Sequence, residues 1–180
     1  MVGLTAVLSL LAVPFDDLRL ALWRDQGALD SGEVWRLATP LLIQFGPWPS
    51  AVCVLALNLV IGTAVERVYG RVRWLEVYLA CGIVGQAFGY LWDPPDAGSS
   101  VAGAGLLGAL CAWLLSPAAR SPLPPRVMAG VGLAAGLALI ALGDMHGPPL
   151  LLGGVLGALF TTRRYGRDRV GRNHRKEASA

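Results

Sequence analysis

Charged side chains are scarce in this chain. Only 15% of its 180 residues are Asp, Glu, Lys or Arg, whereas 54% are hydrophobic and 23 are glycines. A soluble domain carries about 25% charged residues, and glycine is more frequent in transmembrane helices than in soluble ones. The composition therefore excludes an ordinary soluble domain and predicts a polytopic membrane protein.

Cysteine and histidine are also sparse. The three cysteines, Cys53, Cys81 and Cys111, each lie within an apolar run, without a CxxC pair or a nearby histidine. We interpret them as small buried apolar residues rather than zinc ligands or disulfide partners, and we expect neither a metal nor a cofactor. The only histidines are His146 and His174, so a histidine base in any catalytic site has just two sources.

The apolar runs predict an all-α bundle of six transmembrane helices. They cover Val2–Val13, the second half of Leu37–Val65, Val77–Trp92, Ala97–Ala119, Val127–Gly143 and Met145–Thr162. A bilayer core of about 30 Å requires roughly 20 helical residues, so the first run is too short to cross alone. Either the given start of the chain lies too late, or this helix continues into Phe15–Leu22.

Basic residues gather on one side of the predicted bundle. Twelve of the 15 lie in the inner loops and the tail, and the other three are Arg19, Arg24 and Arg36. This bias predicts that both termini are cytoplasmic, in the plasma (inner) membrane. It fits a lipid surface better than nucleic acid as the partner. We expect a membrane domain over residues 1–162 and a basic, disordered cytoplasmic tail over residues 163–180.

Two connecting segments have a distinctive composition. The outer segment, residues 15–49, is unusually apolar for a loop. It is predicted to form short interfacial helices with tryptophans at headgroup depth, although a membrane-hugging connector is the alternative. The inner segment Ser116–Arg126 contains four prolines and is expected to be an extended spacer.

Small residues recur at four-residue spacing in the fourth and sixth apolar runs. The pairs are Gly105 with Ala109, Gly108 with Ala112, Gly153 with Gly157, and Gly154 with Ala158. Such faces let two helix backbones approach closely in lipid. The fourth and sixth helices are therefore predicted to pack face to face, with the start of the sixth near Ser99 and Ser100.

Four motifs, in order along the chain, resemble those of the rhomboid family of intramembrane serine proteases. They are Trp35-Arg36 followed by Thr39, Gly62–Gly70 with its Glu66-Arg67, Gly98-Ser99-Ser100 with Gly105 and Gly108, and Leu152-Gly153-Gly154 followed by Gly157. The resemblance runs from about residue 34 to residue 160. It implies a six-helix core with a water-filled cavity open to the outside, and transmembrane helices of other proteins as partners within the bilayer.

The resemblance places the family's nucleophile on Ser100. A serine at a helix N-terminus suits that role because free backbone N–H groups there can bind an oxyanion; alternatively, Ser99 or Ser100 caps the helix. The family's histidine base falls on Leu151, and its two oxyanion-stabilising side chains fall on Ser50 and Val54. Leucine cannot act as a base, so the family dyad is absent at its usual positions.

His146 offers a relocated base. It precedes Pro148 and Pro149, which suit the first turn of a helix, so we expect it in the loop just outside the sixth helix. From that loop its ring could bend toward Ser100, with Asp144 orienting it; otherwise it is a solvated or helix-capping residue. A ring more than about 6 Å from the Ser100 hydroxyl would argue against catalysis.

Two functions remain open at this point. The missing family histidine and asparagine, and Val101 in place of the glycine after the nucleophile, favour a non-proteolytic rhomboid-like protein that binds or escorts transmembrane segments. The alternative is an intramembrane serine endopeptidase that uses Ser100 with His146. A transporter would need charges on the faces of its spans, and the apolar runs carry only Glu66 and Glu76 at their inner ends.

Overall fold

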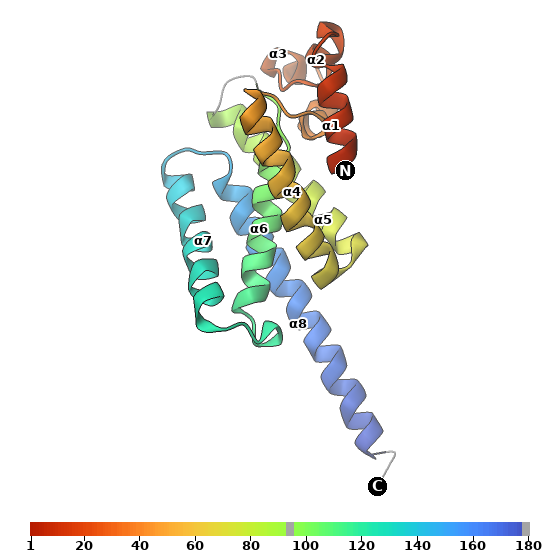
Figure 1. The fold of residues 1–180 in the computed structure, drawn as a ribbon, viewed down its shortest axis with the longest axis vertical. Coiled ribbons are helices and arrows are strands. Elements are labelled where there is room, and N and C mark those ends of the chain that lie inside the picture. Colours follow the sequence, from red (N-terminus) through yellow and green to blue (C-terminus); the bar gives the residue numbers. More distant parts are fainter. Residues whose placement is uncertain (93–95, 178–180) are drawn as a thin grey trace.

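The computed structural model describes residues 1–92 and 96–177, and every regular element in these ranges is helical. In chain order they are α1 (Val2–Leu11), α2 (Asp16–Leu22), α3 (Gln26–Asp30), the 3₁₀ helices η1 (Val34–Leu37) and η2 (Thr39–Leu42), α4 (Trp48–Tyr69), α5 (Arg71–Trp92), α6 (Ser100–Leu115), the 3₁₀ helix η3 (Pro117–Ala119), α7 (Leu123–Ala141) and α8 (Gly147–Glu177). Helices α4 to α8 form an elongated bundle, and α1, α2 and α3 lie beside one end of it (Figure 1).

Helix α6 is the centre of the bundle. It contacts α4, α5, α7 and α8, and most of its 16 residues are small or aliphatic. Val101, Ala102, Leu106 and Ala109 are fully buried in the core that these contacts create. The glycines and alanines of α6 let neighbouring helices approach its backbone closely on several sides, which explains the central place of α6.

The close packing of α6 against α8 confirms the prediction from the small-residue spacing. A Cβ atom added at Gly153 would collide with the carbonyl oxygen of Gly105, and one added at Gly157 would lie 2.7 Å from that of Ala109. Without side chains at these positions, the two backbones touch. The start of α8 is thereby held beside the start of α6.

The first helix ends before the outer segment begins. Helix α1 stops at Leu11, and α2 starts separately at Asp16. The expectation that the first helix continues into Phe15–Leu22 is therefore wrong. Pro14 explains the break, since proline lacks an N–H donor and disfavours helical geometry in the residue before it.

Two of the apolar helices, α4 and α7, have both the length and the hydropathy of a membrane span within the described residues. Helices α1 and α6 are apolar but shorter. Six crossings therefore stay a prediction. Helix α7 also starts earlier than expected, because Pro124 and Pro125 lie in its first turn, where a missing N–H costs nothing. Together with η3, this shows that the segment Ser116–Arg126 is not simply an extended spacer.

The outer segment consists of short helices, as its composition predicts. Arg36 holds them together, since its guanidinium donates to the carbonyl oxygens of Leu20 (2.7 Å) and Trp23 (2.9 Å) and pairs with Glu33 (2.7 Å). The neighbouring Trp35 is 55% exposed. Arg36 thus connects the end of α2 to the start of η1.

The C-terminal helix extends further than the sequence suggests. Helix α8 continues to Glu177, across most of the segment predicted to be a disordered tail. No proline interrupts residues 163–177, and the Arg, Lys and Glu residues in this segment favour helix. One cysteine also differs from its expected burial: Cys53 is exposed on α4, whereas Cys81 and Cys111 are buried.

Candidate active site

Ser100 and His146 occupy the same end of the bundle on different elements. Ser100 is the first residue of α6, and His146 immediately precedes α8, as its place before two prolines predicts. The loop that carries His146 is tight: Gly143 has a positive φ of 72°, and the Asp144 N–H donates to the Leu139 carbonyl at 2.9 Å. A left-handed backbone of this kind favours glycine.

The two side chains meet directly. The Nε2 atom of His146 lies 2.9 Å from the Oγ atom of Ser100. On the other side of the ring, Nδ1 lies 2.8 Å from a carboxylate oxygen of Asp144, and the same oxygen accepts the His146 backbone N–H at 2.8 Å. With the ring neutral and its proton on Nδ1, the Nε2 lone pair faces the serine hydroxyl. This is the geometric pattern of a serine–histidine–aspartate triad.

Asp144 keeps its negative charge in this setting. Partial burial raises the pKa of the Asp144 carboxyl. The hydrogen bonds from the His146 backbone and ring, together with the ring's charge, lower this pKa by more than burial raises it. The net result is a pKa below the ordinary value of 3.8. At neutral pH the carboxylate is therefore ionised and can orient the ring.

Ser99 occupies the N-cap position of α6, but its hydroxyl makes no capping bond. Its side chain is 1% exposed and receives a hydrogen bond from the Asn58 amide at 3.0 Å. Its backbone N–H and its hydroxyl both donate to the side-chain oxygen of Gln44, at 3.0 and 3.2 Å. Asn58 thus bonds a neighbouring helix, which is the usual role of an intramembrane asparagine.

The positions on which the resemblance places the family's other site residues have surroundings of their own. Leu151 packs against Gly136 of α7, and Ser50 is exposed in the first turn of α4. Val101 is fully buried and fits against Gly85 of α5, which has no side chain to obstruct it. Among the described residues, no three His, Cys, Asp or Glu side chains gather to hold a metal ion.

Two polar residues near the site were not recognised in the sequence. Arg24 is 1% exposed and Gln86 is completely buried, and the Arg24 guanidinium donates to the Gln86 amide oxygen at 3.0 Å. Gln86 donates in turn to the carbonyl of Gly98 at 3.0 Å. The sequence offers one hint: Gln86 is a polar residue inside the apolar run Val77–Trp92. Polar residues in such runs are often functional.

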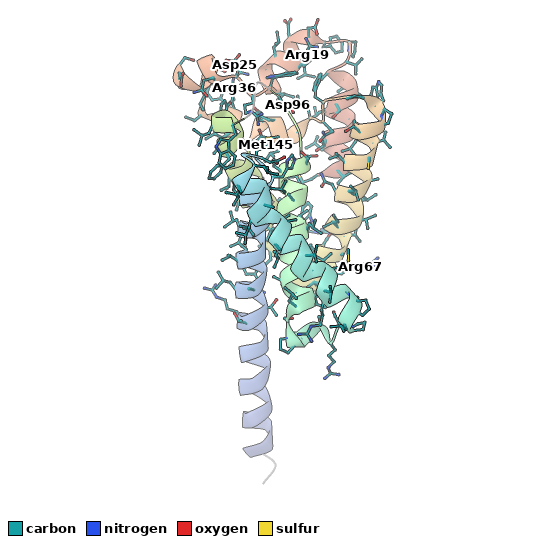
Figure 2. The ribbon with its side chains drawn as sticks, turned by 90° about the vertical axis from the view of Figure 1, so that its left-hand side faces the viewer. Arg19, Asp25, Arg36, Arg67, Asp96 and Met145 are labelled. Atoms are coloured by element: carbon teal, nitrogen blue, oxygen red, sulfur yellow. The ribbon has the colours of Figure 1, made fainter. Side chains whose placement is uncertain are left out.

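Other motif residues lie away from the triad. Glu66 pairs with Arg71 at 3.1 Å at the turn between α4 and α5. Figure 2 shows Arg67 far from the end of the molecule that holds Asp96 and Met145, the latter adjacent to His146. The glutamate–arginine motif therefore belongs to the scaffold rather than to the site.

A family model described as the Rhomboid domain matches residues 31–167 of this chain. The match covers most of the chain, including the second half of the outer segment, the central helix α6 with Ser100, and the loop that carries Asp144 and His146. The chain belongs to the rhomboid family, whose members are integral to membranes.

Two curated relatives have names that refer to proteolysis. The rhomboid protease GluP of Bacillus subtilis (strain 168) is 45% identical over 94 residues, which are 52% of this chain and 18% of the relative. YdcA of the same organism, named as a candidate rhomboid protease, is 35% identical over 97 residues, 49% of this chain and 48% of the relative. The chain thus spans less than half the length of either relative.

Proposed function

We propose that this protein is an intramembrane serine endopeptidase of the rhomboid type, with Ser100 as nucleophile, His146 as base and Asp144 as its orienting carboxylate. One observation carries the proposal: the hydrogen-bonded chain from Ser100 Oγ through the His146 ring to Asp144, at 2.9 and 2.8 Å. A serine hydroxyl needs an adjacent base to become a nucleophile. The loop before α8 supplies that base in place of the family position, Leu151.

The chemistry follows from this arrangement. The Nε2 atom of His146 takes the hydroxyl proton as Ser100 Oγ attacks the carbonyl carbon of a peptide bond, forming a tetrahedral intermediate. The protonated ring then gives that proton to the leaving amine, and an acyl group remains on Ser100. Water, deprotonated by the same ring, hydrolyses the acyl ester and restores the serine. The first backbone N–H groups of α6 are available to stabilise the oxyanion.

A second candidate function is the binding or escort of transmembrane helices without cleavage. Val54 favours it, because valine offers no hydrogen-bond donor where the resemblance places an oxyanion-stabilising side chain. Loss of one such donor typically slows a protease by about 10²–10³. This reading predicts a folded protein whose Ser100 is unreactive, so one experiment separates the two candidates.

Orientation in the membrane is part of the same proposal. The triad lies at the end beside α2 and α3, whereas the turn from α4 to α5 and the loop from α6 to α7 lie at the other end (Figure 1). The inner-loop arginines predicted to be cytoplasmic belong to that second end. In a plasma (inner) membrane the triad would then face the outside, and transmembrane segments of other proteins would be its substrates.

A serine-reactive fluorophosphonate probe tests the proposed function. We expect the purified full chain in detergent to be labelled, and Ser100→Ala to abolish labelling. His146→Ala should slow labelling by about 10²–10⁴, the usual contribution of a general base. The matched control is His174→Ala, which removes the other histidine and should label like the wild type.

Each outcome distinguishes the candidates. Absence of labelling in the wild type, while an active rhomboid protease labels in the same tube, contradicts the protease and supports the binding function. Labelling that survives in His146→Ala at the wild-type rate contradicts His146 as the base. Equal loss in His146→Ala and His174→Ala would point to a general effect of the substitutions instead of a site.

A further inference from the structure

The segments that lead into Ser100 and His146 meet a single buried arginine, Arg24. We propose that Arg24, acting with Gln86, is a positioning residue that fixes the distance between the nucleophile and its relocated base. The proposal rests on the protease function for its consequence, since it concerns the geometry that the triad needs. Both residues act on chain neighbours of the triad: Gln86 bonds to Gly98, two residues before Ser100, and Arg24 contacts Met145, directly before His146.

The first link reaches the segment before Ser100. The Gln86 amide nitrogen donates to the Gly98 carbonyl at 3.0 Å, and the Gln86 amide oxygen accepts from Arg24 Nη1 at 3.0 Å. The Arg24 backbone N–H also donates to the Asp96 carbonyl at 3.0 Å. The segment before α6 is therefore connected to Arg24 at two residues. The bond to Asp96, four residues before Ser100, is direct, and the connection to Gly98, two residues before Ser100, runs through Gln86.

The second link reaches the segment before α8. The same Nη1 atom of Arg24 lies 3.3 Å from the sulfur of Met145, the residue directly before His146. A thioether is a weak acceptor, but this partly buried contact places the Met145 side chain against the guanidinium. Gly89 of α5 makes the space, because a Cβ added there would collide with Arg24.

A base on a loop needs such support more than a base on a helix. A histidine at position 151 would be held by the backbone of α8, whereas His146 lies outside that helix. A catalytic group must be held within about 0.5 Å of its productive position. Arg24, at 1% exposure, contacts both loops at once and provides a fixed reference for each of them.

The experiment uses the full chain in detergent with ¹⁵N-labelled histidine and His174→Ala, so that His146 gives the only ring signals. We expect Arg24→Met to shift the His146 Nδ1 and Nε2 signals toward those of a ring without fixed partners. The same change should slow fluorophosphonate labelling of Ser100 at least tenfold. Gln86→Leu, which removes the hydrogen bonds of Gln86 to Gly98 and to Arg24 but keeps Met145 beside the guanidinium, should also slow labelling at least tenfold.

Arg36→Met is the matched control, because the Arg36 guanidinium bonds to Leu20, Trp23 and Glu33 within the outer segment. It should lower the midpoint of thermal unfolding as Arg24→Met does, yet leave the ring signals unchanged and labelling within about threefold. Unchanged ring signals and labelling in Arg24→Met, or equal changes in Arg36→Met, overturn the positioning role. If Arg24→Met does not fold, Gln86→Leu decides by the same criteria.

The two proposals can fail separately. An unlabelled wild type ends the protease proposal, and the ring signals of His146 in Arg24→Met against Arg36→Met then decide the positioning role alone. A labelled wild type with an insensitive Arg24→Met keeps the protease and removes the positioning role.

Discussion

Adjacent serines at the start of α6 have opposite surroundings. Ser99 is 1% exposed, and its hydroxyl bonds to Asn58 and Gln44, so it stabilises the contact of α6 with its neighbours. Ser100 is only partly buried and faces the His146 ring at 2.9 Å. The proposed chemistry at this helix start therefore uses the second serine, and the first anchors the start of α6 to its neighbours.

The Asp144 carboxylate gives a prediction with a defined pH range. Asp144→Asn removes the negative acceptor of the His146 ring and should slow Ser100 labelling by about 10²–10⁴, as expected for loss of the orienting carboxylate. Because the folded pKa of Asp144 lies below 3.8, its stabilising effect is fully present above 3.8 and is lost as the pH falls through the lower folded value.

Thermal unfolding across pH measures this effect. The difference in unfolding midpoint between wild type and Asp144→Asn should be present at pH 5 and above and shrink below about pH 4. Asp25→Asn is a suitable control, since Asp25 accepts a hydrogen bond from Ala28 at the start of α3, away from the triad. A difference that grows as the pH falls would contradict an ionised, stabilising Asp144.

The triad could be assembled from sequence reasoning, but its support could not. The family resemblance places the nucleophile on Ser100, and His146 is one of only two histidines and precedes the two prolines of a predicted helix start. Arg24 lies 62 residues from Gln86 and 121 from Met145 along the chain. No local pattern encodes contacts at such separations, so only the folded structure brings these three residues together.

At the scale of elements, the packing of α6 on α8 was the most predictable feature. In lipid, small residues at four-residue spacing let the backbones of two helices approach each other closely. The effect of each proline on a helix boundary was less predictable, because proline can either end a helix or occupy the first turn of one. Pro14 separates α1 from α2, whereas Pro124 and Pro125 start α7.

Glycine substitutions test the α6–α8 contact. Gly153→Ala adds a methyl group that collides with the Gly105 backbone, and overpacking of this kind typically costs about 1–3 kcal/mol. Gly130→Ala on α7 is the matched change, since nothing lies within 4 Å of its added Cβ. We expect thermal unfolding in detergent to show a lower midpoint for Gly153→Ala only. Equal midpoints for both variants would contradict the close contact.

At the scale of the whole molecule, the relocated base depends on how three parts of the chain meet. His146 is five residues before Leu151, a separation of about 7 Å along a continuous helix. The loop before α8 closes that gap, while the outer segment supplies Arg24 and α5 supplies Gln86. The structure thus brings Ser100 and His146 into contact, although the sequence resemblance places the family's histidine position on Leu151.

The proposed function makes Ser100 a nucleophile activated by His146. Its most direct test is to treat the full chain with a fluorophosphonate, digest it, and locate the phosphonate adduct by tandem mass spectrometry. We expect one adduct, on Ser100, that forms about 10²–10⁴ more slowly in His146→Ala and at the wild-type rate in His174→Ala. An adduct on Ser99, or an unmodified Ser100 in a sample where an active rhomboid protease is labelled, would contradict it.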